Sequence, residues 1–170
     1  MIIAPILSQS SIALTREIQV SDELGRLSSI HIPVERDLTV YVDKRELVTL
    51  MTMGGCPELL VLGYLRNQRL LETATHIKSI QVDWEVGAAV VVTHQGISHI
   101  EERTAKKIVT TGCGQGTVFG ELMQALDEIQ LPQAVQIRQT HLVSIIEQMR
   151  LHPSIYKKAG SVHACALFTA

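Results

Sequence analysis

The clearest alternation of apolar and polar residues lies in the first half of the chain. Residues 38–42 and 47–53 are rich in β-branched and apolar side chains, and residues 43–46 between them are polar. This pattern is typical of a β-hairpin, here with a four-residue connection. Gly54-Gly55-Cys56-Pro57-Glu58 then ends the second strand. It is predicted to start a helix, because the missing N–H of Pro57 is not needed in a first helical turn.

The expected helix is followed by a second pair of strands. Its broad apolar face is formed by leucines at 59, 60, 62, 65, 70 and 71. Residues 76–84 and 88–94 are β-rich and flank Glu85-Val86-Gly87, which predicts another hairpin. His94 and His99 are interpreted as surface or edge-strand histidines, since a spacing of five does not suit a helical metal pair.

A glycine-rich stretch from Thr110 to Thr117 surrounds a single cysteine, Cys113, with Gly112, Gly114 and Gly116. Before it, residues 97–100 are predicted to form a short strand, residues 101–107 a solvated connection and residues 108–110 a strand. After it, residues 118–129 show helical spacing and predict an amphipathic helix that ends before Pro132.

The position of Cys113 suggests a reactive thiol. Glycines let the backbone approach a ligand closely, and a predicted helix N-terminus just after the loop would favour the thiolate. Sulfur transfer and nucleophilic catalysis both require such a group. The alternative is a glycine-rich turn around a buried cysteine, since free cysteine is often buried. Cys56, also at a predicted helix start, is interpreted as a packed small residue in a tight turn.

The ends of the chain carry weaker patterns. Residues 140–150 predict a helix with Thr140 as its N-cap, residues 154–160 a further helical turn, and residues 162–168 a strand. Residues 1–30 are mixed, and the serines at 8, 10 and 11 suggest turns or a loose arm with no chemistry of their own. We therefore expect an arm over 1–30, a β-rich and helical domain over 31–107, and a further domain over 108–170.

Composition narrows the possible functions. The 170 residues are 46% hydrophobic and carry a net charge of −2, which favours a packed globular protein and gives no basic footprint for nucleic acid. Three separated cysteines do not suggest a disulfide framework and suit a reducing cytoplasm. No apolar run reaches the roughly 18 residues that a membrane helix needs.

Three ordered segments resemble the FdhD family of formate dehydrogenase accessory sulfurtransferases. The first runs from Glu35 to Leu65 and contains Met51-Thr52-Met53-Gly54-Gly55-Cys56-Pro57-Glu58-Leu59. The second is Thr111-Gly112-Cys113-Gly114-Gln115-Gly116, which is similar to the family's S/T-G-C-G-x-C-G loop. The third runs from Tyr156 to Phe168 and contains Gly160-Ser161-Val162-His163-Ala164-Cys165-Ala166-Leu167.

The resemblance implies a two-part protein of the α/β (α+β) class. An N-terminal β-hairpin and helix region would be followed by a partial cytidine-deaminase-like domain over residues 108–170. It implies that Cys113 takes persulfide sulfur from a cysteine desulfurase. The sulfur would pass to the molybdenum bis-guanine-dinucleotide cofactor of formate dehydrogenase, which is a transient acceptor and not a tightly bound cofactor. By analogy, Gly112, Gly114, Gly116, Gly160 and His163 would line the cofactor side of the site.

The chain departs from the family pattern in two ways. Gly116 stands where the second loop cysteine belongs, so Cys56 and Cys165 become candidate substitutes. The family's later segment, which completes the second domain, is not present. An incomplete sheet leaves an exposed edge, and we therefore expect a homodimer or larger homo-oligomer.

Two other functions compete with the sulfur carrier. One is a degenerate binding protein that holds the molybdenum cofactor or a formate dehydrogenase subunit without transferring sulfur. The other is a zinc protein that uses Cys113, Cys165 and a histidine. His99-Ile100-Glu101 spells the H-x-E of zinc deaminases, but no C-x-x-C follows it, so no metal site is expected.

Overall fold

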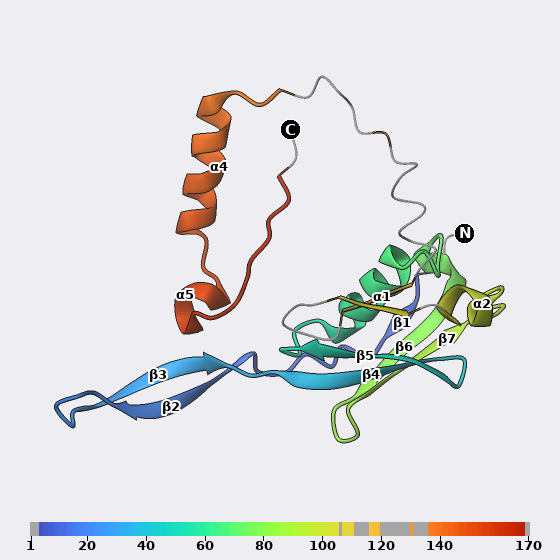
Figure 1. Cartoon of the computed structure of the whole chain (residues 1–170), viewed down its shortest axis with the longest axis horizontal. Helices are drawn as coiled ribbons and strands as arrows, with labels where there is room; N and C mark the ends of the chain where they lie inside the picture. The colour runs from blue at the N-terminus through green and yellow to red at the C-terminus, as the bar shows by residue number, and fades with distance from the viewer. Residues whose placement is uncertain (1–3, 106, 111–115, 120–129, 131–135, 169–170) are drawn as a thin grey trace. The chain divides into compact units, whose positions relative to one another are not determined.

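The computed structural model describes residues 4–105, 107–110, 116–119, 130 and 136–168. The chain divides into two units. Unit 1 comprises Met1–Ala13 and Glu35–Ile129, and unit 2 comprises Leu14–Val34 and Gln130–Ala170. Each unit combines strands with helices (Figure 1). The α+β class expected from the sequence is therefore confirmed. The division at residues 30 and 107 and the cytidine-deaminase-like assignment stay predictions.

Unit 1 is built on a five-stranded sheet with the order β1-β6-β7-β4-β5. Two antiparallel hairpins form most of it: β4 (Arg36–Val42) with β5 (Arg45–Thr52), and β6 (Ile77–Asp83) with β7 (Ala88–Thr93). β4 joins the two hairpins by pairing parallel to β7, and β1 (Ile6–Leu7) pairs parallel to β6. Both hairpins expected from the sequence are confirmed.

The connection of the first hairpin is shorter than expected. Val42 pairs with Arg45, so only Asp43 and Lys44 form the turn, with φ of 47° and 72°. Positive φ at both central residues matches the right-handed twist of the strands, which is why two-residue turns of this kind are favoured in hairpins. The predicted four-residue connection was wrong because Arg45 and Glu46 extend the ladder despite being polar.

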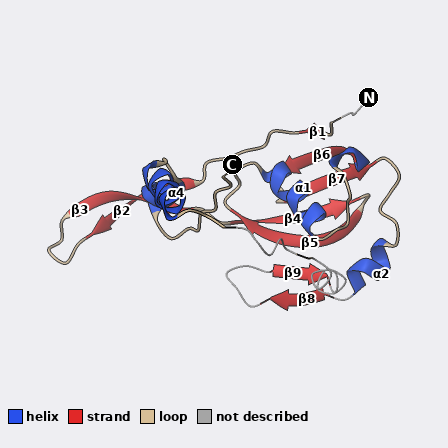
Figure 2. Ribbon diagram, turned by 90° about the horizontal axis from the view of Figure 1, so that it is seen from above, coloured by secondary structure: helices blue, strands red, loops and turns tan. Residues whose placement is uncertain are grey.

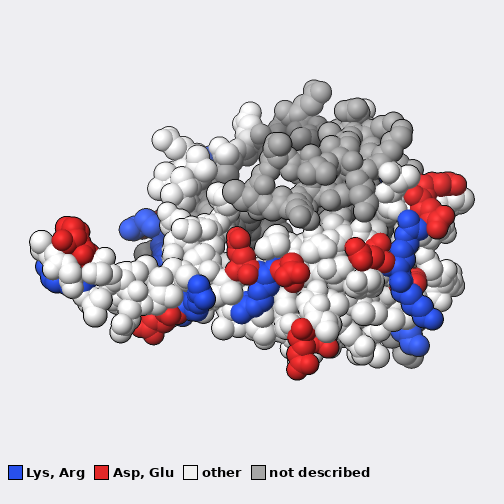
Figure 3. Space-filling view, turned by 60° about the horizontal axis from the view of Figure 1, so that its bottom comes forward, with Lys and Arg blue, Asp and Glu red and all other residues white. Residues whose placement is uncertain are grey.

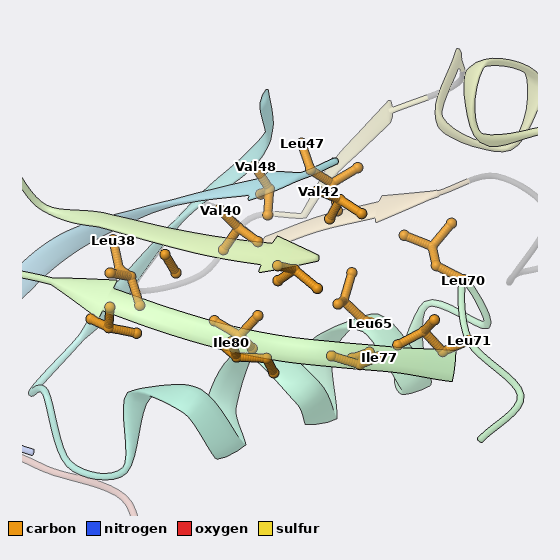
Figure 4. Close-up of a cluster of buried hydrophobic side chains, with 14 residues drawn as sticks. Leu38, Val40, Val42, Leu47, Val48, Leu65, Leu70, Leu71, Ile77 and Ile80 are labelled. Atoms are coloured by element: carbon orange, nitrogen blue, oxygen red, sulfur yellow. The ribbon is translucent and has the colours of Figure 1, made fainter. Parts of the chain in front are cut away.

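The core of unit 1 lies between the sheet and α1 (Pro57–Asn67) (Figure 2). Along β4 the buried residues alternate with partly exposed ones, as a strand with one covered face requires. Figure 4 shows the cluster. Its members are almost all aliphatic: Leu38, Val40, Val42, Leu47, Val48, Val61, Leu65, Leu70, Leu71, Ile77, Ile80, Val82, Ala89 and Val91.

The short elements after β7 differ from the prediction. Residues 97–100 form no strand. Instead Ile97 and Ile100 pack against the core, and α2 (Ile100–Ala105) begins where a solvated connection was expected. Glu101 and Glu102 occupy the first turn of α2, where acidic side chains interact favourably with the helix dipole. A short 3-10 turn, η1 (Ala74–His76), precedes β6.

Unit 2 contains a hairpin, β2 (Thr15–Ser21) with β3 (Leu27–Pro33), which the sequence analysis missed. It also contains α4 (Gln139–Leu151) and α5 (Ile155–Ala159), and both predicted helices are confirmed. The N-cap of α4 is Arg138 and not Thr140. Ser154 caps α5, because its Oγ accepts a hydrogen bond from the Lys157 N–H at 3.4 Å.

Candidate functional site

The glycine-rich cysteine segment is bracketed by a second antiparallel pair, β8 (Lys107–Thr110) and β9 (Gly116–Phe119). Thr110 pairs with Gly116, and the segment between them, with Gly112, Cys113 and Gly114, lies outside the described residues. The strand predicted over 108–110 is confirmed. The helix predicted to begin at Val118 is wrong at its start, because Val118 pairs with Ile108 in a strand. Because residues 116–119 form a strand, they provide no helix dipole to favour the thiolate of Cys113.

Gly160 and His163 lie at the end of unit 2. Gly160 follows α5 with φ of 63°, and its N–H donates to the Tyr156 carbonyl at 2.8 Å. A glycine suits this position because a side chain is strained at positive φ. His163 is exposed. The strand predicted over 162–168 is absent from this part of the described chain, where no described strand lies alongside to supply hydrogen-bond partners.

Cys165 is an exposed free thiol in unit 2. It lines a hollow of about 520 Å³ formed with the end of α4, α5 and the segment around residue 164. His152, Tyr156 and Lys157 line the same hollow. The lining of this hollow therefore includes a thiol, an imidazole and an ammonium group. Cys165 is the only described cysteine of unit 2.

Cys56 is the N-cap of α1. Its backbone has φ of 47° and ψ of 54°, its N–H donates to Ser11 Oγ at 3.0 Å, and its thiol is exposed. The carbonyl of Cys56 accepts the N–H groups of Leu59 and Leu60 at 3.0 and 3.1 Å. The predicted helix start at Pro57 is confirmed, but the interpretation of Cys56 as a packed residue was wrong. The backbone of Cys56 caps the helix while its side chain faces solvent.

A buried carboxylate lies in the first turn of α1 and was missed by the sequence analysis. Glu58 is 3% exposed, and its Oε1 accepts hydrogen bonds from Ser8 Oγ and from the Ser10 N–H, both at 2.6 Å. Burial alone would raise the pKa of this carboxyl. The hydrogen bonds from Ser8 and Ser10 outweigh burial, so the pKa lies below its usual value of 4.5.

The serines that were expected to form a loose arm are thus fixed in place. Ser10 Oγ donates to the Val82 carbonyl at 3.0 Å, and Ser8 Oγ accepts the Val82 N–H at 3.0 Å. The indole N–H of Trp84 donates to the Ser10 carbonyl at 2.6 Å. Residues 8–10 therefore connect the start of α1 to the end of β6. No local pattern could reveal this, because each contact spans at least 48 residues of sequence.

A second feature that sequence reasoning missed is a groove of about 590 Å³ at the other end of α1. Its walls come from the loop after α1, the 3-10 turn η1, the loop after β7, and α2. Its ionisable side chains are those of Arg69, Glu72, His76, His94 and Arg103. On the face seen in Figure 3, basic and acidic side chains are interspersed.

Two other features, a metal-binding cluster and a membrane-spanning helix, are absent from the described part of the chain. Within the described ranges, no group of three or more His, Cys, Asp and Glu side chains is placed to hold a metal ion. Among the described helices, none combines the length and apolar character that crossing a membrane requires.

Comparison with known proteins identifies relatives. The sequence model of the FdhD/NarQ family matches residues 33–170. A sulfur carrier protein FdhD from Listeria monocytogenes is 23% identical over 149 residues, which are 85% of this chain and 57% of the relative. The sulfur carrier protein FdhD of Bacillus licheniformis is 25% identical over 134 residues, covering 78% and 51%. The chain therefore spans about half the length of the curated relatives it matches.

A solved structure is also similar. A protein from Desulfotalea psychrophila, described as a formate dehydrogenase accessory protein, aligns with 46% of this chain and 33% of its own, with 20% identity and a TM-score of 0.40. The family inferred from the three ordered motifs is confirmed by the match over residues 33–170.

Proposed function

This chain belongs to the FdhD/NarQ family, and we propose that it is a sulfur carrier that serves formate dehydrogenase through Cys113. The observation that carries the proposal is the family match over residues 33–170, which includes the Gly112-Cys113-Gly114 segment. Relatives that align with most of this chain are named sulfur carrier proteins. Of the three cysteines, Cys113 alone stands in the family's loop motif.

In the proposed reaction, the Cys113 thiolate attacks the outer sulfur of a persulfide on a cysteine desulfurase. The new S–S bond forms at Cys113 while the old one breaks, and the desulfurase cysteine leaves as a thiolate. The outer sulfur then passes to the molybdenum bis-guanine-dinucleotide cofactor, the acceptor substrate. The acceptor supplies the electron pair of the new bond to sulfur, while the S–S bond at Cys113 breaks and Cys113 leaves as the thiolate. Gly112, Gly114, Gly116, Gly160 and His163 are proposed to line the acceptor side.

The proposal also includes a cytoplasmic location and a homo-oligomeric state. Free thiols at Cys56 and Cys165 suit a reducing cytoplasm. We also propose a homo-oligomer, because β5 is an edge strand of the five-stranded sheet and Met51 on it is 45% exposed. Edge strands of this kind pair readily with another chain. Light scattering at increasing protein concentration tests this, and a monomer throughout would contradict it.

A specific observation favours a second candidate function, a binding protein without sulfur transfer. The family's second loop cysteine is replaced by Gly116, which is the first residue of β9 and pairs with Thr110. A resolving thiol is thus missing from that position. Such a protein would bind the molybdenum cofactor or a formate dehydrogenase subunit without transferring sulfur.

Intact-protein mass spectrometry separates the two candidates. The protein is incubated with a cysteine desulfurase and cysteine, then compared with Cys113→Ser, and with Cys56→Ser and Cys165→Ser as matched thiol controls. A gain of about 32 Da for each sulfur atom, lost only in Cys113→Ser, supports the carrier. No gain in the unmodified protein contradicts sulfur transfer and favours the binding protein. A gain that persists in Cys113→Ser moves the carrier to Cys56 or Cys165.

A further inference from the structure

The hollow beside Cys165 lies within unit 2, where the chain turns back after its longest helix. The end of α4 is closed by the His152 N–H, which donates to the Gln148 carbonyl at 3.0 Å. After α5, Gly160 redirects the chain with φ of 63°. Residues 164–168 then line the same hollow as the end of α4 (Figure 1). Two helices and a returning segment of one unit therefore form the hollow together.

Apolar side chains provide much of its lining. Met149, Tyr156 and Phe168 are 43%, 61% and 37% exposed. Alanines at 164 and 166 leave space between these larger side chains. A volume of about 520 Å³ falls within the range of small-molecule sites. An apolar chain placed here would remove both its own surface and these side chains from water, which is favourable.

The ionisable part of the lining is positively charged. Arg150 comes from α4 and Lys157 from α5, and no described Asp or Glu side chain lines the hollow. Glu147 is the acidic residue of α4, and it lies outside the lining. Neither cation forms an ion pair with a described carboxylate. The end of α4 contributes a partial negative charge of about half a unit, which two full positive charges outweigh. The hollow therefore attracts an anionic group.

We propose that this hollow binds a small molecule with an apolar chain and a terminal carboxylate, a ligand class that goes beyond the proposed sulfur transfer and does not depend on it. The chain lies against Met149 and Phe168, and the carboxylate pairs with Arg150 and Lys157. Guanidinium and ammonium groups both form charge-assisted hydrogen bonds with carboxylates. A nucleotide suits this hollow less well, because its polar surface would cover the apolar walls and lose water without gaining partners.

The test is a titration of the full chain with octanoate, an acid that stays monomeric at millimolar concentrations. We expect saturable binding by calorimetry, with a Kd of about 1 mM or tighter. At ten times Kd, alkylation of Cys165 by iodoacetamide should slow at least about fivefold, because about nine tenths of the hollow is then occupied. Peptide mass spectrometry measures this rate. Cys56, an exposed thiol of unit 1, is the control in the same sample and should react at an unchanged rate.

Two other compounds test the ligand class. 1-Octanol keeps the apolar chain but lacks the carboxylate, and it should bind at least about fivefold more weakly than octanoate. Guanosine monophosphate is anionic but polar, and it should not compete with octanoate. Competition by guanosine monophosphate, or equal affinity for octanol, would overturn the proposed ligand class and leave the proposed sulfur transfer untouched.

Substitutions decide whether the hollow is responsible. Arg150→Gln and Lys157→Gln change exposed side chains, so the fold should be retained. Each should weaken octanoate binding about fivefold and leave octanol binding unchanged, since only a charge-assisted contact is lost. Lys158→Gln is the matched control, because Lys158 is the neighbouring exposed cation of α5 and lies outside the lining. Absent saturation, equal protection of Cys56 and Cys165, or an equal loss in Lys158→Gln would each overturn the proposal.

Discussion

Removing the Glu58 carboxylate should measure how strongly the N-terminal segment is bound to α1. Two donors, Ser8 Oγ and the Ser10 N–H, share its Oε1 at 2.6 Å. A hydrogen bond to a charged group contributes roughly 1.5–3 kcal/mol, and two bonds to one oxygen are not additive. We expect Glu58→Ala to lower the free energy of unfolding by roughly 3 kcal/mol. Glu58→Gln keeps a neutral oxygen acceptor and should cost about 1 kcal/mol.

The stability contributed by the Glu58 carboxylate should depend on pH. Burial raises the pKa of Glu58, but the hydrogen bonds from Ser8 and Ser10 bring it below 4.5. The unfolded chain therefore binds this proton more readily than the folded one. The stabilising contribution is fully present above the unfolded-state pKa, and it is lost as the pH falls through the folded-state pKa. Between about pH 6 and about pH 3, the unmodified protein should lose more stability than Glu58→Gln.

Urea denaturation followed by Trp84 fluorescence is the appropriate assay. Trp84 is the single tryptophan of the chain, and its indole N–H donates to the Ser10 carbonyl at 2.6 Å. The matched control is Glu101→Gln, whose carboxylate is 85% exposed and pairs with Arg45. It should change stability by no more than about 0.5 kcal/mol. Parallel pH profiles for the unmodified protein and Glu58→Gln would refute the reasoning.

Substitutions at three further positions test the fold of unit 1. Gly54→Ala should destabilise it by roughly 1–3 kcal/mol and shift the emission of Trp84. The reason is that φ is 86° at this position and the new methyl group would lie 2.6 Å from Ile12 Cγ1. Unchanged stability in urea would contradict this prediction. Leu65→Ala, at a fully buried position, should cost roughly 2–5 kcal/mol by calorimetry. Asp43→Ala should cost roughly 2 kcal/mol in the same assay, since its carboxylate accepts the Thr93 N–H at 2.9 Å and hydroxyl at 2.7 Å. Asp43→Asn should cost less, because Asn tolerates positive φ and keeps an acceptor.

The local pattern predicted those elements whose formation depends on neighbouring residues. The strands at 36–42 and 77–83 alternate between buried and exposed positions, and that alternation is visible in the sequence. The helix from Pro57 follows from proline in a first turn and leucines at helical spacing. The hairpin over 15–33 was missed because its turn depends on side-chain contacts. Asp22 Oδ1 accepts the N–H groups of Leu24 and Arg26, each at 2.9 Å.

The candidate sites were predictable only in part. A cysteine among glycines is a local motif, so Cys113 could be selected from the sequence. Glu58 could not, since its partners lie 48 and 50 residues away in a segment that looks like an arm. The groove around Arg69 is likewise formed by four segments that meet only in the folded chain. Long-range hydrogen bonds and charge clusters of this kind leave no periodic trace in the sequence.

The two features at the ends of α1 should act independently. Glu58 is in the first turn and Arg69 follows the last, and an 11-residue helix spans about 16 Å. Substitutions that far apart with no shared partner are normally additive within about 0.5 kcal/mol. The effects of Glu58→Gln and Arg69→Gly on unfolding should therefore sum in the double variant. A coupling above about 1 kcal/mol would mean that α1 transmits a change from one end to the other.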